Sequence, residues 1–318
     1  MPSEHDSLPF APPADYHQAL AAGWLPIREV ARRTGVNPVT LRAWERRYGL
    51  IVPMRTAKGH RLYSNEQISR VQQVLTWLER GVAVSKVRGL LDDQRDPAPS
   101  GASPWNTLLY QALSAIAQVD ERQLDELFNG ALSIYPAQTL CEHLMLPLEA
   151  ELRQRWQGQF GSTLERLFYH AWLRSKLGSR LYHHNRQQQG APLLLINHSE
   201  LPQETGHWLC AWLASSAGCP VRVLDGPLPT GELALAEQRL QPRALVLFSS
   251  QALNLPQLPR QLNGCQGPIL LAGSAVNIHY VELIELRESS LPDLHLAESP
   301  LDVREQLDQL GLLQGGRR

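Results

Sequence analysis

Basic, amide and hydroxyl side chains gather in residues 26–63, where their spacing suits contact with DNA. Asn37 and Pro38 are typical of a helix N-cap and first helical position, and Gly49 of a helix end. A helix with such a polar face fits the major groove, where arginine and amide side chains read base edges. The expected DNA contacts from the helices are Arg28, Asn37, Thr40, Arg42, Arg46, Arg47 and Tyr48.

Two helices and a basic hairpin are needed to position these side chains. The first helix is expected to start at Pro26, and Gly35 is expected to make the tight turn before the second. Val39 and Trp44 are expected to be core, because a helix must bury one face. Residues 50–63 predict the hairpin, whose expected contacts with DNA are Arg55, Lys58, Gly59, His60, Arg61 and Tyr63.

This segment resembles the winged helix-turn-helix of the MerR family of bacterial transcription regulators. The resemblance is nearly continuous over residues 24–91. It rests on Ile27-x-Glu29-Val30-Ala31, on Thr40-Leu41-Arg42-x-Trp44-Glu45-Arg46-Arg47-Tyr48-Gly49-Leu50 and on Arg55-x-x-x-Gly59-x-Arg61-x-Tyr63. It implies that the second helix enters the major groove while the wing follows the phosphate backbone. The implied partners are double-stranded DNA at an inverted repeat, RNA polymerase at the promoter, and a second copy of the chain.

The charge distribution supports a nucleic-acid-binding segment independently. Residues 24–91 hold 13 Lys and Arg against 4 Asp and Glu, a net charge of +9. The whole chain holds 30 and 31, so the remainder has a net charge of −10. A near-neutral chain that concentrates its positive charge in one segment is typical of a DNA-binding part joined to a part that binds none.

Composition bounds the remaining classes. The hydrophobic content of 43% is enough for packed cores, and no apolar run approaches the roughly 18 residues of a membrane span. Residues 1–22 predict a disordered arm rather than a leader, and the expected location is the cytoplasm, at the nucleoid. No metal site is expected, because no cysteine has CxxC or Cys/His spacing. The cysteines are Cys141, Cys210, Cys219 and Cys265.

Hydrophobic periodicity divides the rest of the chain. Helical spacing of leucines over residues 105–188 predicts a four-helix bundle, and apolar runs alternating with amphipathic segments over 190–318 predict a Rossmann-like (flavodoxin-like) parallel sheet. The predicted strands are 193–197, 221–224, 244–248 and 269–272. The predicted fold is multi-domain, with an all-α winged helix-turn-helix (23–92), a linker (93–104), the bundle and the α/β domain.

This order of domains resembles regulators that carry a cobalamin-binding module, including light-sensing repressors and curli-type regulators. The segment from Leu144 to Trp156 is similar to the third bundle helix of that module, and Ser249-Ser250 and Gly273-Ser274 stand where its Ser and Gly-Gly pair lie. The module supplies a histidine to cobalt in the pattern Asp/Glu-x-His-x-x-Gly. Here Gln203 stands in the ligand position, and an amide is a poor substitute for imidazole.

A second cobalamin-handling pair also differs, since Arg166-Leu167 replace the Glu-His that light-sensing members carry after the bundle tryptophan. We therefore expect no cofactor. The alternative is a light-responsive repressor that binds the corrin without a protein ligand.

Three roles then remain for the C-terminal part. It could hold another small effector in a pocket, or it could be a dimerisation or docking domain, which we favour. The third role, a cobalamin-type methyltransferase, is disfavoured because no catalytic partner domain, GxSxG or HExxH motif is present; we expect no enzyme and no catalytic residue. The candidate pocket residues are Trp156, His198, Gln203, Ser249 and Gly273.

Overall fold

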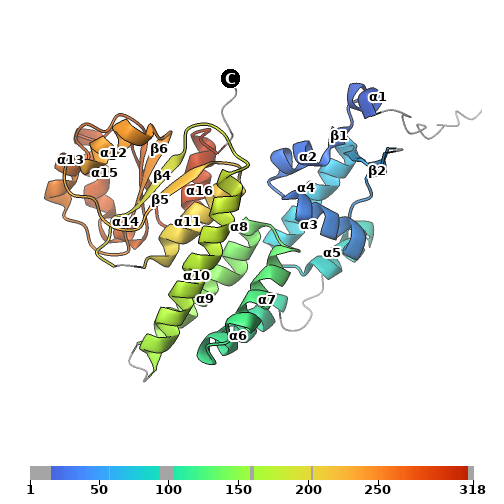
Figure 1. The fold of residues 1–318 in the computed structure, drawn as a ribbon, viewed down its shortest axis with the longest axis horizontal. Coiled ribbons are helices and arrows are strands. Elements are labelled where there is room, and N and C mark those ends of the chain that lie inside the picture. The colour runs from blue at the N-terminus through green and yellow to red at the C-terminus, as the bar shows by residue number, and fades with distance from the viewer. Residues whose placement is uncertain (1–15, 57, 94–102, 158–160, 202, 314–318) are drawn as a thin grey trace, which may run out of the picture. The chain divides into compact units, whose positions relative to one another are not determined.

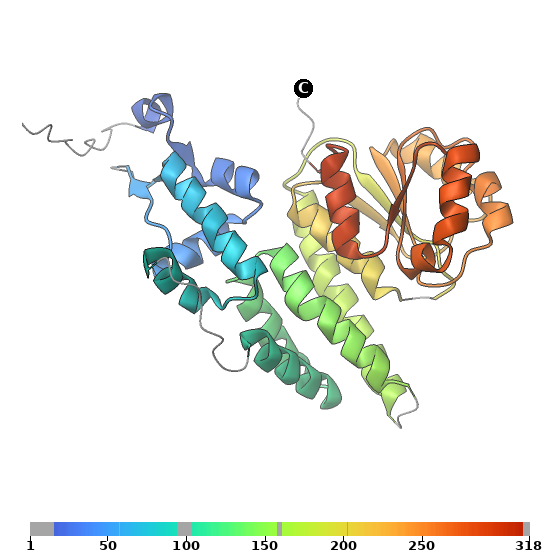
Figure 2. The ribbon, with the colours of Figure 1, turned by 180° about the vertical axis from the view of Figure 1, so that it is seen from behind.

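The computed structural model describes residues 16–56, 58–93, 103–157, 161–201 and 203–313. They form two compact units (Figures 1 and 2). The first comprises Met1–Pro104 together with Gly130–Pro136, and the second comprises Trp105–Asn129 and Ala137–Arg318. Most of the predicted N-terminal arm (1–22) and of the linker (93–104) lies outside the described residues. No described helix is both long and apolar enough to cross a membrane.

The first unit is a helical domain with a small antiparallel sheet. Its sheet has the order β1-β3-β2; β2 and β3 form the predicted hairpin, and β1 adds a third strand. Pro26 has extended backbone and precedes the first helix of the motif rather than starting it. The elements are α1 (Tyr16–Ala21), β1 (Leu25–Pro26), α2 (Ile27–Thr34), α3 (Pro38–Ala43), the π-helix η1 (Trp44–Tyr48), β2 (Met54–Arg55), β3 (Arg61–Tyr63), α4 (Asn65–Glu79) and α5 (Val84–Asp93).

Capping residues set the helix boundaries of this unit as the sequence predicts. The Asn37 side chain accepts hydrogen bonds from the backbone N–H groups of Val39 and Thr40, at 2.7 and 3.0 Å. Gly49 ends the second helix in the left-handed conformation, with φ of 59°. Ser64 caps α4 by accepting from the Gln67 N–H. The Gln67 side-chain amide donates to the Val52 carbonyl.

A short segment from later in the chain completes the first unit. Gly130–Pro136 follows the body of α7 (Glu121–Leu132) in sequence, and its Ile134 carbonyl accepts a 2.8 Å hydrogen bond from the Trp44 indole N–H. Tyr135 is buried and hydrogen-bonds to the backbone of Val84. The acceptor for a fully buried tryptophan of η1 is thus supplied 90 residues downstream.

Four long helical runs open the second unit, as predicted. They are α6 (Pro104–Ala117), α7, the continuous run α8 (Ala137–Leu140), η2 (Cys141–Met145) and α9 (Leu146–Arg155), and α10 (Ser162–Asn185). A polar contact joins two of them: Asp125 of α7 accepts from the Trp172 indole at 2.7 Å and pairs with Lys176 at 2.7 Å. Both partners lie on α10, so this carboxylate fixes the register of the two helices.

The C-terminal part is a five-stranded parallel sheet with the order β5-β4-β6-β7-β8. This is the flavodoxin-like order. The strands are β4 (Leu193–Asn197), β5 (Val221–Leu224), β6 (Ala244–Phe248), β7 (Ile269–Ala272) and β8 (Leu294–Ala297). The first four match the prediction, whereas β8 was missed because its short run is interrupted by His295. The helices are α11 (Thr205–Ser216), α12 (Glu232–Leu240), α13 (Leu258–Gln261, after the 3-10 turn η3, Leu255–Gln257), α14 (Ser274–Ile278), α15 (Tyr280–Ser289) and α16 (Pro300–Gln309).

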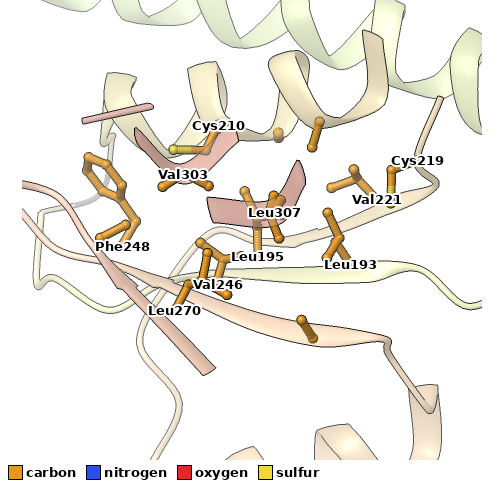
Figure 3. Close-up of a cluster of buried hydrophobic side chains, with 14 of the residues drawn as sticks. Leu193, Leu195, Cys210, Cys219, Val221, Val246, Phe248, Leu270, Val303 and Leu307 are labelled. Atoms are coloured by element: carbon orange, nitrogen blue, oxygen red, sulfur yellow. The ribbon is translucent and has the colours of Figure 1, made fainter. Parts of the chain in front are cut away.

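Alternate residues of the strands face opposite layers of helices. Leu193 and Leu195 pack with α11 and α16, in the cluster that Figure 3 shows, whereas Leu194 and Ile196 pack with α12 to α15. Burial on both faces explains why β4, β6 and β7 have continuous apolar sequences. Helix α11 also packs along α10, so that it lies between the sheet and the bundle.

Gly273 follows β7, and its backbone lies close to the backbone of Ser249, which follows the neighbouring strand β6. A Cβ there would lie 2.4 Å from the Ser249 carbonyl oxygen, and φ is +97°. Gly311 has φ of +68° with nothing within 4 Å of the same position. We expect Gly273→Ala to lower the free energy of unfolding by about 1–3 kcal/mol more than Gly311→Ala, because both carry the φ strain but only one meets backbone. Urea denaturation measures both variants; equal losses would contradict the close approach.

Candidate DNA-binding surface and regulatory site

One face of α3 and η1 carries the exposed basic side chains. Arg42, Arg46 and Arg47 are exposed, as are Arg28 on α2 and the cap residue Asn37; Tyr48 is half-buried. Arg42 and Arg46 follow Val39 at helical spacing, and Val39 itself is 57% exposed. This face therefore stands clear of the helices that pack on the opposite side.

Three expectations about this helix and the wing are corrected by burial. Thr40 and Tyr63 are fully buried, so neither side chain is available to DNA in this conformation. Val39 was expected in the core but is exposed, whereas Trp44 is buried as expected. Helix α2 packs on α3, and Thr40, Leu41 and Trp44 are on the buried side of α3 and η1, whereas Val39 and Arg42 are on the exposed side.

The wing presents fewer free cations than its sequence predicts. Lys58, Gly59 and His60 are exposed at its tip, where the Gly59 N–H donates to the Thr56 carbonyl at 2.8 Å. Arg55 and Arg61 instead point to Glu45 of η1, with N–O distances of 2.6 and 2.5 Å. Glu45 was not among the predicted site residues, because the sequence marks it only as an acid inside a basic helix.

The remaining candidate residues lie at the carboxyl end of the sheet and on the bundle facing it. His198, Ser249 and Gly273 each follow a strand, and their N–H groups donate to Phe248, Ala272 and Ala297, the last residues of the neighbouring strands. Gln203 contacts the bundle: its Oε1 lies 3.1 Å from Nδ1 of His170 on α10. The Trp156 ring stacks edge-on against His170, with centroids 5.7 Å apart.

These contacts leave little room for a corrin. The cavity between His170, Gln203 and Trp208 has a volume of about 10 Å³, enough for about one water molecule. Farther in, the Phe248 ring occupies the space beside Gly206, where a Cβ would lie 2.2 Å from its tip. Gln203, at the position of the cobalt-ligating histidine, is held by His170 and offers no imidazole. The residues present therefore do not fit a histidine-ligated cobalamin.

A buried polar cluster lies where α9 and α10 meet the start of α11, and sequence reasoning missed it. Burial raises the pKa of Glu149 to about 6, against the lowering effect of the Tyr169 and Thr205 hydroxyls. Glu204, the N-cap of α11, accepts from the Ser250 hydroxyl at 2.5 Å. No pattern marks the Glu149 carboxylate as shielded from solvent, because Glu151 and Arg153 of the same helix are exposed.

One histidine of this region is shielded from solvent. His207 is fully buried in α11, and burial lowers its pKa. Its Nδ1 lies 4.0 Å from the Asp225 carboxylate. Among the described residues, no group of three or more His, Cys, Asp or Glu side chains is placed to hold a metal ion.

Comparison with known proteins agrees with this geometry. Residues 25–94 match the MerR HTH family regulatory protein model, and residues 108–180 match the B12 binding domain model. The regulator MlrA of Escherichia coli (strain K12) is 36% identical over 201 residues, covering 62% of this chain and 78% of its own. The repressor CarH of Myxococcus xanthus is 25% identical over 280 residues, covering 80% and 90%, and CarA of the same organism is 29% identical over 133 residues, covering 41% and 45%.

Fold and surface together define a winged helix-turn-helix protein joined to a helical bundle and parallel sheet of the cobalamin-binding type. The chain belongs to the MerR family of transcriptional regulators.

Glu149 gives the second unit a pH-dependent stability. Its pKa is raised from 4.5 to about 6, so proton binding stabilises the fold below pH 4.5, and this contribution is lost as the pH rises through 6. At pH 8 the ionised, buried carboxylate opposes folding by about 2 kcal/mol. We expect Glu149→Gln to gain about 2 kcal/mol over wild type between pH 4 and pH 8, measured by urea denaturation. Glu151→Gln, at an exposed site on α9, is the control; equal pH profiles for all three proteins would contradict the burial of Glu149.

Proposed function

We propose that this regulator binds a specific promoter sequence, with α3 and η1 in the major groove and the wing tip on the phosphate backbone. The observation that carries the proposal is the exposed face of Arg42 and Arg46; Arg47 and, on the wing, Lys58 are exposed as well. Arginine reads guanine through two parallel hydrogen bonds, whereas lysine at a wing contacts phosphate without reading sequence.

The chain acts as a homodimer on an inverted repeat, in the cytoplasm at the nucleoid. A single winged helix contacts too few base pairs to select one site in a genome, and two copies double the sequence read. The second proposed partner is RNA polymerase at the same promoter, because a transcriptional regulator acts on the polymerase that starts there. None of this requires catalysis, and we propose that the chain is not an enzyme.

The C-terminal part regulates DNA binding without histidine-ligated cobalamin. Support comes from the Gln203–His170 contact and from the Phe248 ring beside Gly206. A docking or dimerisation role, or an unidentified small effector smaller than a corrin, fits these contacts. The second candidate, a cobalamin-dependent and light-responsive repressor, is favoured by the match of residues 108–180 to a B12 binding domain.

Substitution on the helix and on the wing should separate base reading from phosphate contact. We expect Arg42→Ala and Arg46→Ala each to weaken binding to a selected operator by about 1–3 kcal/mol, with little effect on unselected DNA. Lys58→Ala should weaken binding to both and flatten the dependence on salt. Fluorescence anisotropy with duplexes selected from a random pool measures both. Unchanged operator affinity in the Arg42/Arg46 double variant would remove the assignment of the recognition helix.

Absorbance spectroscopy decides between the two regulatory candidates. We expect the protein to be colourless after incubation with adenosylcobalamin in the dark and desalting, because Gln203 offers no imidazole and His170 occupies its amide. Gln203→His is the matched variant, since it restores the ligand type. A retained corrin band in the wild-type protein would establish the second candidate, and light-dependent operator binding would be measured next.

A further inference from the structure

Glu45 connects the recognition helix to both strands of the wing. Its Oε1 lies 2.6 Å from Nη2 of Arg55 on β2, and its Oε2 lies 2.5 Å from Nε of Arg61 on β3. The Glu45 side chain is only 14% exposed. Burial acts to raise its pKa, but the hydrogen bonds from Arg61 and Arg55 outweigh this, and the pKa lies below its ordinary value.

The two arginines are direct partners across the hairpin. Arg55 stands opposite Arg61 in the antiparallel register of β2 and β3. Like charges directly opposite each other on a strand pair are destabilising. The carboxylate between them removes this repulsion, and because it belongs to η1 it also fixes where the hairpin stands relative to the recognition helix.

We propose that Glu45 is a positioning residue for DNA recognition: by holding Arg55 and Arg61, it sets the wing at the distance from the recognition helix at which both contact the same duplex. The inference rests on the proposed function. It assigns the two arginines a mainly inward role, with the wing's phosphate contacts left to Lys58 and to the outer edge of Arg55, which is 50% exposed. A guanidinium has five N–H donors, so Arg55 can serve both.

If Glu45 acted only through its charge, its removal would raise the affinity for DNA rather than lower it. Loss of one negative charge beside a DNA-binding surface raises affinity for every duplex, because phosphate attraction is independent of sequence. A positioning role predicts instead that affinity for the selected site falls while affinity for other DNA holds or rises. The ratio of the two affinities therefore separates the explanations.

The test uses the full chain and Glu45→Gln, which keeps the shape of the side chain. The probes are a duplex enriched from a random-sequence pool by the wild-type protein and an unenriched duplex of the same length and composition. We expect roughly tenfold weaker binding to the enriched duplex, and equal or tighter binding to the other, across a salt series. The control is Glu29→Gln, since Glu29 also pairs with two arginines, Arg32 and Arg33, at 2.6 and 3.0 Å, but within a single helix.

A second variant tests the same contact from the side of the wing, and Arg61→Gln alone, which keeps Glu45, should also reduce discrimination if Glu45→Gln disturbs folding. Arg61→Gln removes a partner of Glu45, and Glu45→Gln added to it should reduce discrimination less than it does in the wild-type protein, because both act through one contact. Equal discrimination by wild type and Glu45→Gln, or full additivity in the double variant, overturns the inference while leaving the proposed function intact. Failure of the wild-type protein to enrich any duplex overturns both.

Discussion

The burial of α11 on both sides is the constraint on which the second unit depends. Cys210, Ala211 and Ala214 pack against the sheet, and the opposite side of the helix lies along α10 of the bundle. A helix that is apolar nearly all round must be enclosed. The bundle and the α/β part therefore share this helix, and the carboxyl end of the sheet faces the bundle directly. His207, near the start of α11, lies between the two layers, which explains why it is buried.

Much of this architecture could be predicted from the sequence. Strands β4, β6 and β7 could be predicted because strands buried on both faces leave continuous apolar runs, and β5 keeps a mainly apolar run although Arg222 is exposed. The caps at Asn37 and Gly49 follow from backbone chemistry within a few residues. Local patterns did not give the direction of side chains. Thr40 and Val39 are neighbours of similar size, and which of them is buried is decided by the packing of α2, a contact that the periodicity of so short a helix does not encode.

For the candidate sites too, the sequence predicted the residue types but not the contacts of their side chains. The basic character of residues 24–91 was evident, but charge alone does not say which arginines face solvent. Arg55 and Arg61 turn toward Glu45, so a count of positive charges overstates the surface available to phosphate. Gln203 could be recognised as a substitution from the motif, whereas its partner His170 lies 33 residues earlier and no pattern linked the two.

The hydrogen bond between Trp44 and Ile134 gives the DNA-binding head a boundary in space that differs from its boundary in sequence. Residues 23–93 contain the whole winged motif, yet the described acceptor for the buried Trp44 indole lies outside them. A buried N–H without an acceptor destabilises a fold by about 1–3 kcal/mol. Residues 23–93 are therefore expected to be less stable when they are fused, without Ile134, to another effector domain. Its transfer to another effector domain needs either a carbonyl that replaces Ile134 or a phenylalanine in place of Trp44.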